Sequence, residues 1–386
     1  MCLSLMKNNR SMVEIYIHIP FCVRKCAYCD FLSFPADGDV QRRYKDALVQ
    51  EIRGSQYAAD GDVGSIFIGG GTPSVLPAYY IEEILSAIRE KWTVLPDAEI
   101  TIEANPGTVD REKLQVYKRA GISRISFGCQ SAEDGELQLL GRIHSWKDFL
   151  ESFCLAREAG FSNINVDLMS ALPGQSADSW EQTLRKVAEL SPEHISAYSL
   201  IIEEGTPFFE TYGQGDKASL LPDEDEERLM YERTAQILET YGFHRYEISN
   251  YAKEGRECRH NTGYWTGVPY IGVGLGASSY SGSRRWKNTD SLAAYLKGDH
   301  APQDVEELSL REREAEFMIL GLRMTAGVSG SEFRQRFGED MEEICGDILN
   351  KYEQMGFMKR TADRIAFTGS GISVSNVILA DIYSRI

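Results

Sequence analysis

The chain has 386 residues, of which 42% are hydrophobic and 26% charged, and its formal net charge at pH 7 is −17. At roughly 150 residues per domain, this length suggests two or three domains with a sizeable buried core. A surface this acidic repels phosphate backbones and anionic lipid headgroups, which argues against a general nucleic-acid or membrane-surface role.

Residues 1–12, MCLSLMKNNRSM, read as an N-terminal extension. Their apolar run is too short for a signal peptide, and no later run reaches the roughly 18 apolar residues that a membrane-spanning helix needs. The eight cysteines carry no sign of export, and in a reducing compartment a tight cysteine triplet is more often a metal site than a disulfide framework. We therefore expect a cytoplasmic protein with no integral membrane span.

Six segments rich in β-branched and aromatic residues follow within residues 13–242, and helical patterns lie between them. The expected strands are 14–19, 65–69, 99–104, 124–129, 163–168 and 194–200, and the expected helices are 40–54, 77–91, 110–120, 145–159, 177–190 and 224–241. This alternation predicts an α/β fold with a parallel sheet and right-handed crossovers. The period alone leaves open whether the sheet is doubly wound or forms a closed or partial barrel.

The rest of the chain divides into two parts. Residues 243–304 are rich in Gly, Tyr and Trp, show no clear period, and are expected to connect the first domain to the last. Residues 305–386 become helical again and close with a hairpin and a helix within 356–383. Helices followed by a short hairpin and a closing helix predict a winged-helix-like α+β C-terminal domain.

Three cysteines, Cys22, Cys26 and Cys29, have the spacing C-x3-C-x2-C directly after the first expected strand. A structural zinc site would normally show four ligands in paired spacing, and the remaining cysteines supply no second pair, so a zinc knuckle is the less favoured interpretation. A 4Fe-4S cluster held by three thiolates leaves one iron open, where the amino and carboxylate groups of S-adenosylmethionine (SAM) can bind. An electron from the cluster can then cleave the bound sulfonium to a 5′-deoxyadenosyl radical.

The triplet resembles the signature of the radical-SAM superfamily. The neighbouring sequence YIHIPFC, residues 16–22, narrows the resemblance to the oxygen-independent coproporphyrinogen dehydrogenases and their relatives, the HemW-type heme chaperones. The resemblance implies a partial (β/α)6 radical-SAM barrel, a 4Fe-4S cluster on the three cysteines, bound SAM and an electron donor to the cluster.

Glycine and polar residues follow the expected strands, at the edge where sites gather in α/β proteins. The glycines of GGGTPS, residues 69–74, are expected to let backbone amides approach a ligand. The resemblance implies contacts to cluster-bound SAM at Tyr16, Gly70, Glu103, Ile201 and Ser278. It also implies a second SAM position, known in the dehydrogenase branch, at Tyr28, Gly71, Thr72, Gln130, Arg142 and Asp167.

Phe31 stands where the dehydrogenases carry a further cysteine, and only about a dozen residues precede the first expected strand. Both features resemble the HemW branch, as does the motif H-N-x-x-Y-W, which occurs here as HNTGYW. A neutral imidazole is a good axial ligand for heme iron, and Tyr and Trp offer flat apolar surface to a porphyrin. The candidate heme-binding residues are therefore His260, Asn261, Tyr264 and Trp265.

Two further residues near these motifs have open interpretations. Cys258, two residues before His260, is either an alternative heme-contacting thiol or, as we prefer, a buried inert cysteine. His18, on the first expected strand, is expected to be a structural histidine close to the cluster.

The resemblance thus implies a heme chaperone that binds heme and passes it to heme-requiring proteins, respiratory proteins among them. A role other than catalysis is favoured, although radical chemistry stays open. One alternative is a coproporphyrinogen dehydrogenase that abstracts propionate hydrogens and releases carbon dioxide, against which Phe31 and the short N-terminus argue. Another is a radical-SAM enzyme that modifies nucleic acid, or a winged-helix DNA-binding protein. The net charge and the lack of a Lys and Arg cluster in 305–386 disfavour any nucleic-acid partner.

Overall fold

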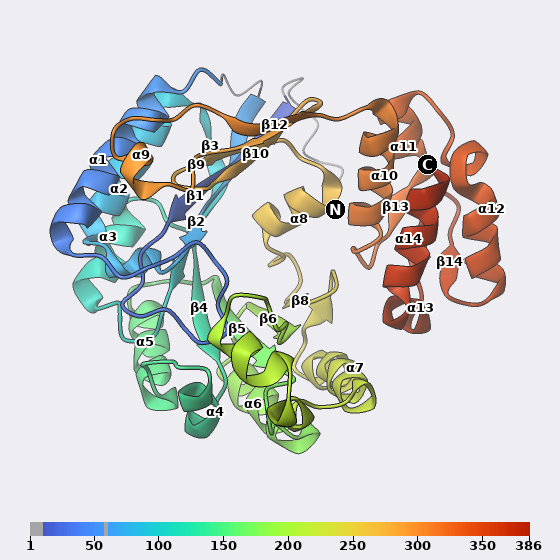
Figure 1. Cartoon of the computed structure of the whole chain (residues 1–386), viewed down its shortest axis with the longest axis horizontal. Coiled ribbons are helices and arrows are strands. Elements are labelled where there is room, and N and C mark those ends of the chain that lie inside the picture. Colours follow the sequence, from blue (N-terminus) through green and yellow to red (C-terminus); the bar gives the residue numbers. More distant parts are fainter. Residues whose placement is uncertain (1–10, 58–60) are drawn as a thin grey trace.

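The computed structural model describes residues 11–57 and 61–386, so residues 1–10 of the expected N-terminal extension lie outside the described residues. A curved sheet with helices on its outer side forms one part of the molecule, and a smaller C-terminal domain lies beside it (Figure 1). In the described ranges, no helix is long and apolar enough to cross a membrane.

Six parallel strands form the centre of the sheet, and each pairs with the next along the chain. Helices cover their outer side, so the predicted α/β fold with a partial (β/α)6 barrel is confirmed (Figure 1). The strands are β1 (Ser11–Ile19), β2 (Gly61–Gly70), β3 (Val94–Ala104), β4 (Arg124–Gln130), β5 (Ile164–Ser170) and β6 (His194–Ser199). The helices are α1 (Gly38–Gly54), α2 (Ala78–Lys91), α3 (Arg111–Arg119), α4 (Asp134–Leu139), α5 (Trp146–Glu158), α6 (Ala177–Glu189) and α7 (Glu224–Thr240).

Side chains that follow the strands fix where the helices begin. Asp37, Asp110, Ser145 and Ser176 each accept a hydrogen bond from the backbone amide three residues further on. Such an N-cap stabilises a helix by about 1 kcal/mol. Because the caps stand at the ends of the strand-to-helix loops, they also hold those loops at the carboxyl edge of the sheet.

The sheet continues past the six parallel strands at both edges. On one side β9 (Tyr270–Val273) pairs parallel with β1 and is followed by the antiparallel strands β10 (Ser278–Ser281), β11 (Arg284–Lys287) and β12 (Gln303–Glu307). On the other side β8 (Asn250–Ala252) and β7 (His244–Arg245) extend the sheet beyond β6. Helices α8 (Arg259–Thr266) and α9 (Leu292–Tyr295) lie between these strands in sequence. Residues 243–304, for which the sequence shows no clear period, thus supply strands at both edges of the sheet.

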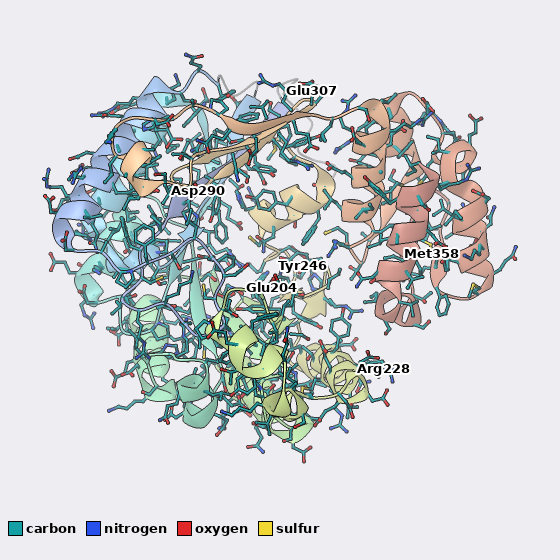
Figure 2. The ribbon with its side chains drawn as sticks, viewed as in Figure 1. Glu204, Arg228, Tyr246, Asp290, Glu307 and Met358 are labelled. Atoms are coloured by element: carbon teal, nitrogen blue, oxygen red, sulfur yellow. The ribbon has the colours of Figure 1, made fainter. Side chains whose placement is uncertain are left out.

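The C-terminal domain has its own hydrophobic core, which includes Met318, Phe333, Leu349 and Ile378. Figure 2 places Met358 in this domain and Tyr246 on the part of the sheet that faces it. The predicted hairpin and closing helix are present. Its elements are α10 (Leu310–Gly321), β13 (Val328–Ser329), α11 (Gly330–Phe337), α12 (Met341–Gln354), β14 (Met358–Arg360), β15 (Arg364–Phe367), α13 (Gly369–Ser373) and α14 (Ser375–Arg385).

Candidate functional site

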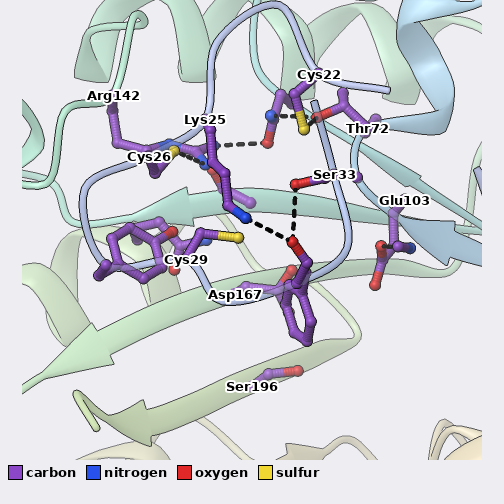
Figure 3. A pocket seen from close by; sticks show the side chains of 18 of the residues that line it. Cys22, Lys25, Cys26, Cys29, Ser33, Thr72, Glu103, Arg142, Asp167 and Ser196 are labelled. Atoms are coloured by element: carbon purple, nitrogen blue, oxygen red, sulfur yellow. Dashed lines mark hydrogen bonds between the residues drawn. The ribbon is translucent and has the colours of Figure 1, made fainter. Parts of the chain in front are cut away.

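A cavity of about 330 Å³ opens at the carboxyl ends of the parallel strands (Figure 3). It lies where a parallel barrel gathers its functional side chains, because all six strands end at the same edge. Most of the site residues expected from the sequence line it. They are Cys22, Cys26, Tyr28, Cys29, Gly70, Gly71, Thr72, Glu103, Gln130, Arg142 and Asp167.

The three cysteines lie on the loop between β1 and α1, and all three are free and partly exposed. Backbone hydrogen bonds fix this loop: the Cys22 amide donates to the Phe34 carbonyl at 3.1 Å, and the Ala27 amide donates to the Leu140 carbonyl at 3.1 Å. The Lys25 ammonium crosses the loop and donates to the Phe31 carbonyl at 2.9 Å. The loop therefore presents its thiols to the cavity from a defined position.

A chain of hydrogen bonds joins two of the thiols. Arg142 donates through Nη1 to Cys26 Sγ at 3.6 Å and through Nη2 to Asn105 Oδ1 at 2.6 Å. Asn105 Nδ2 then donates to Thr72 Oγ1 at 2.8 Å, and Thr72 Oγ1 donates to Cys22 Sγ at 3.7 Å. Donors aimed at sulfur stabilise a thiolate, which is the form that binds metal.

The three thiols that line the cavity match the number of cysteine ligands that a 4Fe-4S cluster with one open iron requires. Within the described residues, no three His, Cys, Asp or Glu side chains converge as ligands of one ion would. A 4Fe-4S cluster binds each thiolate through a different iron, so its ligands stand apart around a shared space. Three thiols around one cavity, two of them receiving hydrogen bonds, fit that requirement.

The glycine run at the end of β2 packs against the cysteine loop. The amides of Gly71 and Thr72 donate to the carbonyls of Ile19 and Phe21 at 2.8 and 2.7 Å, and the Gly70 amide donates to Glu103 at 3.1 Å. A Cβ on Gly71 would lie 2.7 Å from the Phe21 carbonyl oxygen, so only glycine allows this approach. These amides have partners within the protein, and their approach to a ligand stays a prediction.

Two carboxyl groups face the cavity from β3 and β5. Surrounding protein raises the pKa of Glu103 to about 8, and the nearby Asp167 carboxylate adds to this rise. Burial also raises the pKa of Asp167, whose oxygens accept hydrogen bonds from Asn165 and Ser126 at 2.7 and 3.1 Å. At neutral pH Glu103 is therefore mainly protonated, and its hydroxyl can donate to a ligand oxygen.

Gln130 ends β4 in a strained backbone conformation, with φ of 70°. A register shift between Gly128 and Gln130 accompanies it, and the side chain accepts a hydrogen bond from the Tyr198 hydroxyl at 2.9 Å. Non-glycine residues in this region cost on the order of 1 kcal/mol or more and cluster at functional sites. The bulge directs an amide side chain into the cavity wall.

Three residues expected to contact SAM do not line this cavity. The Tyr16 hydroxyl is hydrogen-bonded to His18 Nδ1 at 3.1 Å, Ile201 is 69% exposed after β6, and Ser278 is exposed at the start of β10. Their contacts with SAM stay predictions. His18 is buried and its Nε2 contacts the Leu32 carbonyl at 2.9 Å, as expected of a structural histidine beside the cysteine loop.

Several cavity residues were not expected from the sequence. Asn105, which the sequence analysis left without a role, connects Arg142 to Thr72, and it could have been noticed because it follows the end of β3. Ser249 and Asn250 come from the section without a period, where no signal marks them. The cavity residues missed by the sequence analysis include Arg24, Lys25, Ser33, Asn105, Gly128, Ser196, Tyr198, Ser249 and Asn250.

The HNTGYW motif lies on α8, which packs against side chains from the middle of β1 and β2, among them Tyr16, Ser65 and Phe67. His260 is 1% exposed, and its ring nitrogens contact the Ser65 hydroxyl at 2.8 Å and the Tyr264 hydroxyl at 3.1 Å. The imidazole also stacks on Phe67, with 5.2 Å between ring centres. Burial lowers the pKa of His260 to about 3, so the ring is neutral and both nitrogens are engaged within the protein.

Buried ionisable groups surround the motif. Glu14 lies 3.7 Å from His260 Nδ1, but burial raises the pKa of Glu14 to about 9, so this is a contact between neutral groups. Burial likewise raises the pKa of the Cys258 thiol to about 12, and its sulfur lies 3.5 Å from Glu99. Cys258 is buried, as expected, and its lack of reactivity stays a prediction.

Comparison with known proteins adds the family. The family description "Radical SAM superfamily" matches residues 16–187, and "HemN C-terminal domain" matches residues 308–374. The chain is 37% identical to the heme chaperone HemW of Bacillus subtilis (strain 168) over 95% of this chain and 98% of that one. The chain belongs to the HemW family. HemW of Escherichia coli (strain K12) is 35% identical, with 95% of this chain and 97% of that one covered.

A solved structure supports the fold of this HemW-family chain. Coproporphyrinogen III oxidase (HemN) from Escherichia coli, described as a radical SAM enzyme, superposes with a TM-score of 0.84 at 23% identity. The match covers 98% of this chain and 91% of that one. The HemW relatives in sequence confirm the resemblance that the cysteine triplet, Phe31 and HNTGYW predicted, and the solved structure supports the fold.

Proposed function

We propose that this HemW-family chain is a cytoplasmic heme chaperone that binds heme and delivers it to heme-requiring proteins, respiratory proteins among them. The proposal includes a 4Fe-4S cluster on Cys22, Cys26 and Cys29, exchangeable SAM and an electron donor to the cluster. The observation that carries it is the cavity in which these thiols meet the Arg142 and Thr72 donors, in a chain similar to proteins named heme chaperones.

When bound, the cluster would supply one-electron chemistry and an open iron for SAM. The chain's own residues would orient and shield these groups. Arg142 and Thr72 would donate to the cysteine sulfurs, and protonated Glu103 would offer a hydrogen-bond donor to a ligand in the cavity. Phe31, 64% exposed at the cavity wall, would meet an apolar ligand surface rather than hold iron.

Heme contact at HNTGYW belongs to the same proposal. An iron bond to His260 requires its imidazole to leave Ser65 or Tyr264, because both ring nitrogens have partners in the folded chain. Trp265 is half-buried, and because the Arg323 guanidinium lies over its ring at 5.5 Å, a porphyrin would meet the part of the indole that Arg323 leaves uncovered. Asn261 and Tyr264 are also half-buried on α8.

The test combines two assays on anaerobically reconstituted protein. Hemin is titrated while the Soret band is followed, and coproporphyrinogen turnover is measured with SAM and a reductant. A chaperone binds hemin stoichiometrically and shows no turnover at enzymatic rates. Conversion of coproporphyrinogen to protoporphyrinogen at such rates would overturn the proposal in favour of a dehydrogenase.

A further inference from the structure

A second cavity, of about 120 Å³, lies between the edge of the sheet and the C-terminal domain. Backbone contacts join its two sides: the Thr325 amide and hydroxyl both donate to the Tyr246 carbonyl, at 3.0 and 3.1 Å, and Met324 forms a β-bridge with Glu247. Tyr246 lies on the side of the sheet that faces this domain (Figure 2). The cavity is therefore built into the junction.

Three cations line this cavity: Arg245 from β7, Arg323 after α10, and Lys359 from β14. Within residues 11–57 and 61–386, none of them forms an ion pair with a carboxylate, in a protein whose net charge is −17; Arg245 instead lies over the Tyr231 ring at 5.2 Å. Other cations of the same domain are paired, as Arg360 is with Glu353 and Arg385 with Asp347. Unpaired cations around one hollow create a local positive potential that attracts an anion.

Arg323 carries the clearest sign of a missing partner. Its guanidinium lies over the Trp265 ring at 5.5 Å, and its Nε is buried without a hydrogen bond. Trp265 Nε1 is likewise buried and unpartnered. A buried donor without an acceptor costs about 1–3 kcal/mol, and more when it is charged, so an acceptor for the rest of the Arg323 guanidinium would offset part of this cost. A planar guanidinium binds carboxylates with two parallel hydrogen bonds.

Glu247 also lines the cavity, but it does not neutralise these cations. Its carboxyl accepts a hydrogen bond from the Ser249 amide at 3.2 Å, and burial raises its pKa, which favours the uncharged form. The remaining wall combines apolar side chains with hydroxyl groups; the apolar ones include Ile248, Leu322, Phe367 and Ile372, and the hydroxyl residues are Thr325, Thr368 and Ser375. A ligand that fits this lining carries an oxyanion on a short aliphatic arm.

We propose that this junction cavity binds a carboxylate on an aliphatic arm and that, resting on the proposed function, this arm is a propionate of heme. Its volume suits such an arm and not a macrocycle, since pockets that enclose a drug-sized ligand are about 300–1,000 Å³. Arg323 binds the carboxylate, and Lys359 and Arg245 add positive charge. The Arg323 guanidinium stacks on the ring of Trp265 from HNTGYW. The motif thereby joins the site through Trp265.

The test titrates the reconstituted full-length protein with hemin and with hemin dimethyl ester, which lacks the carboxylates. The original chain is expected to bind hemin about tenfold more tightly than the ester, and Arg323→Gln removes this preference. Lys359→Gln, at an exposed position that does not endanger folding, reduces it. Arg323→Lys keeps part of the preference for hemin, because lysine supplies the positive charge but not the two parallel hydrogen bonds of a guanidinium. Arg385→Gln, an exposed arginine of the same domain, is the matched control and keeps the preference in full.

A second arm measures thermal stabilisation by glutarate, a short dicarboxylate, without heme. The original chain is expected to gain stability and Arg323→Gln to gain none. Equal affinity for hemin and its ester overturns the inference while leaving the proposed function intact. Absence of hemin binding by the original chain overturns the proposed function and the heme assignment together, and glutarate binding in that case identifies a carboxylate site for another ligand.

Discussion

The cysteine loop and the HNTGYW helix are the two parts of this chain whose sequences most clearly indicate chemistry, and the fold treats them differently. The cysteine loop faces a cavity of about 330 Å³, with donors aimed at two of its sulfurs. The helix α8 instead buries its histidine against side chains from the middle of β1 and β2. Residue types and spacing indicate what a motif can bind, whereas its place on the sheet decides whether a ligand can reach it.

The largest expected effect concerns the cysteine loop. Cys26→Ala removes one of the three thiolates. The iron and sulfide content of the reconstituted protein is expected to fall from about four of each per chain to a small fraction of that amount. Iron and sulfide analysis, with the absorbance near 400 nm, measures the change. Cys154→Ala, an exposed cysteine on α5, is the control and keeps the full content. A complete cluster in the Cys26 variant contradicts the assignment.

His260→Ala tests whether the histidine of the HNTGYW helix has a structural role. The change removes two hydrogen bonds and the stack on Phe67 and leaves a cavity, so we expect a loss of about 3 kcal/mol in the free energy of unfolding. Urea unfolding of the cluster-free protein measures it. The exposed His244→Ala is the control and costs far less. An unchanged unfolding energy together with a weakened Soret band would point instead to an iron-binding role for His260.

Glu14 is expected to make the free energy of unfolding depend on pH. Its pKa is about 9 in the folded chain and about 4.5 when unfolded, so across this range the folded chain holds a proton that the unfolded chain has released. Stability therefore falls as pH rises from about 4.5 to about 9. Glu14→Gln is expected to remove this contribution, which for one proton between pH 5 and pH 8 is on the order of 4 kcal/mol in the free energy of unfolding.

The pH comparison has two internal checks. Glu103 contributes a similar slope that ends near its pKa of about 8, so some dependence remains in the Glu14 variant. Glu82→Gln, at an exposed position on α2, leaves the slope unchanged. An unaltered slope in Glu14→Gln means that Glu14 ionises normally in the folded chain.

The smallest expected effect is at Phe31. Because its side chain is 64% exposed, Phe31→Ala is expected to change the free energy of unfolding by less than about 0.5 kcal/mol. Hemin affinity should fall by more than this stability change if Phe31 meets an apolar ligand at the cavity wall. Val305→Ala, exposed on β12, provides the matched control for both measurements.

Much of the fold follows from local pattern. The expected strand 14–19 lies within β1, and the expected helix 40–54 lies within α1, which begins two residues earlier at its Asp37 cap. Strands β7 to β12 were missed because they are two to five residues long, too short for a period to show. Such strands form because neighbouring strands of the sheet offer them hydrogen bonds.

The candidate site divides in the same way. Because Cys22, Cys26 and Cys29 are close in sequence, their spacing alone predicts that they share a ligand. Glu103 and Asp167 stand near the ends of expected parallel strands, so they are expected at the same edge of the sheet as the cysteines. Asn105 connects Arg142 to Thr72 by hydrogen bonds between side chains of separate loops. No local sequence pattern encodes such a connection.

By itself the sequence determined the alternation of strands and helices and the resemblance to the HemW family, because these depend on residue type and on short-range period; the barrel was implied by that resemblance, and the three cysteines as cluster ligands stay a proposal. Only the tertiary structure decided that His260 is enclosed between Ser65 and Tyr264, and that Arg323 comes to rest over Trp265 beside unpaired cations. Burial and charge pairing are set by contacts between segments far apart in the chain, so they exist only once the strands and helices have packed.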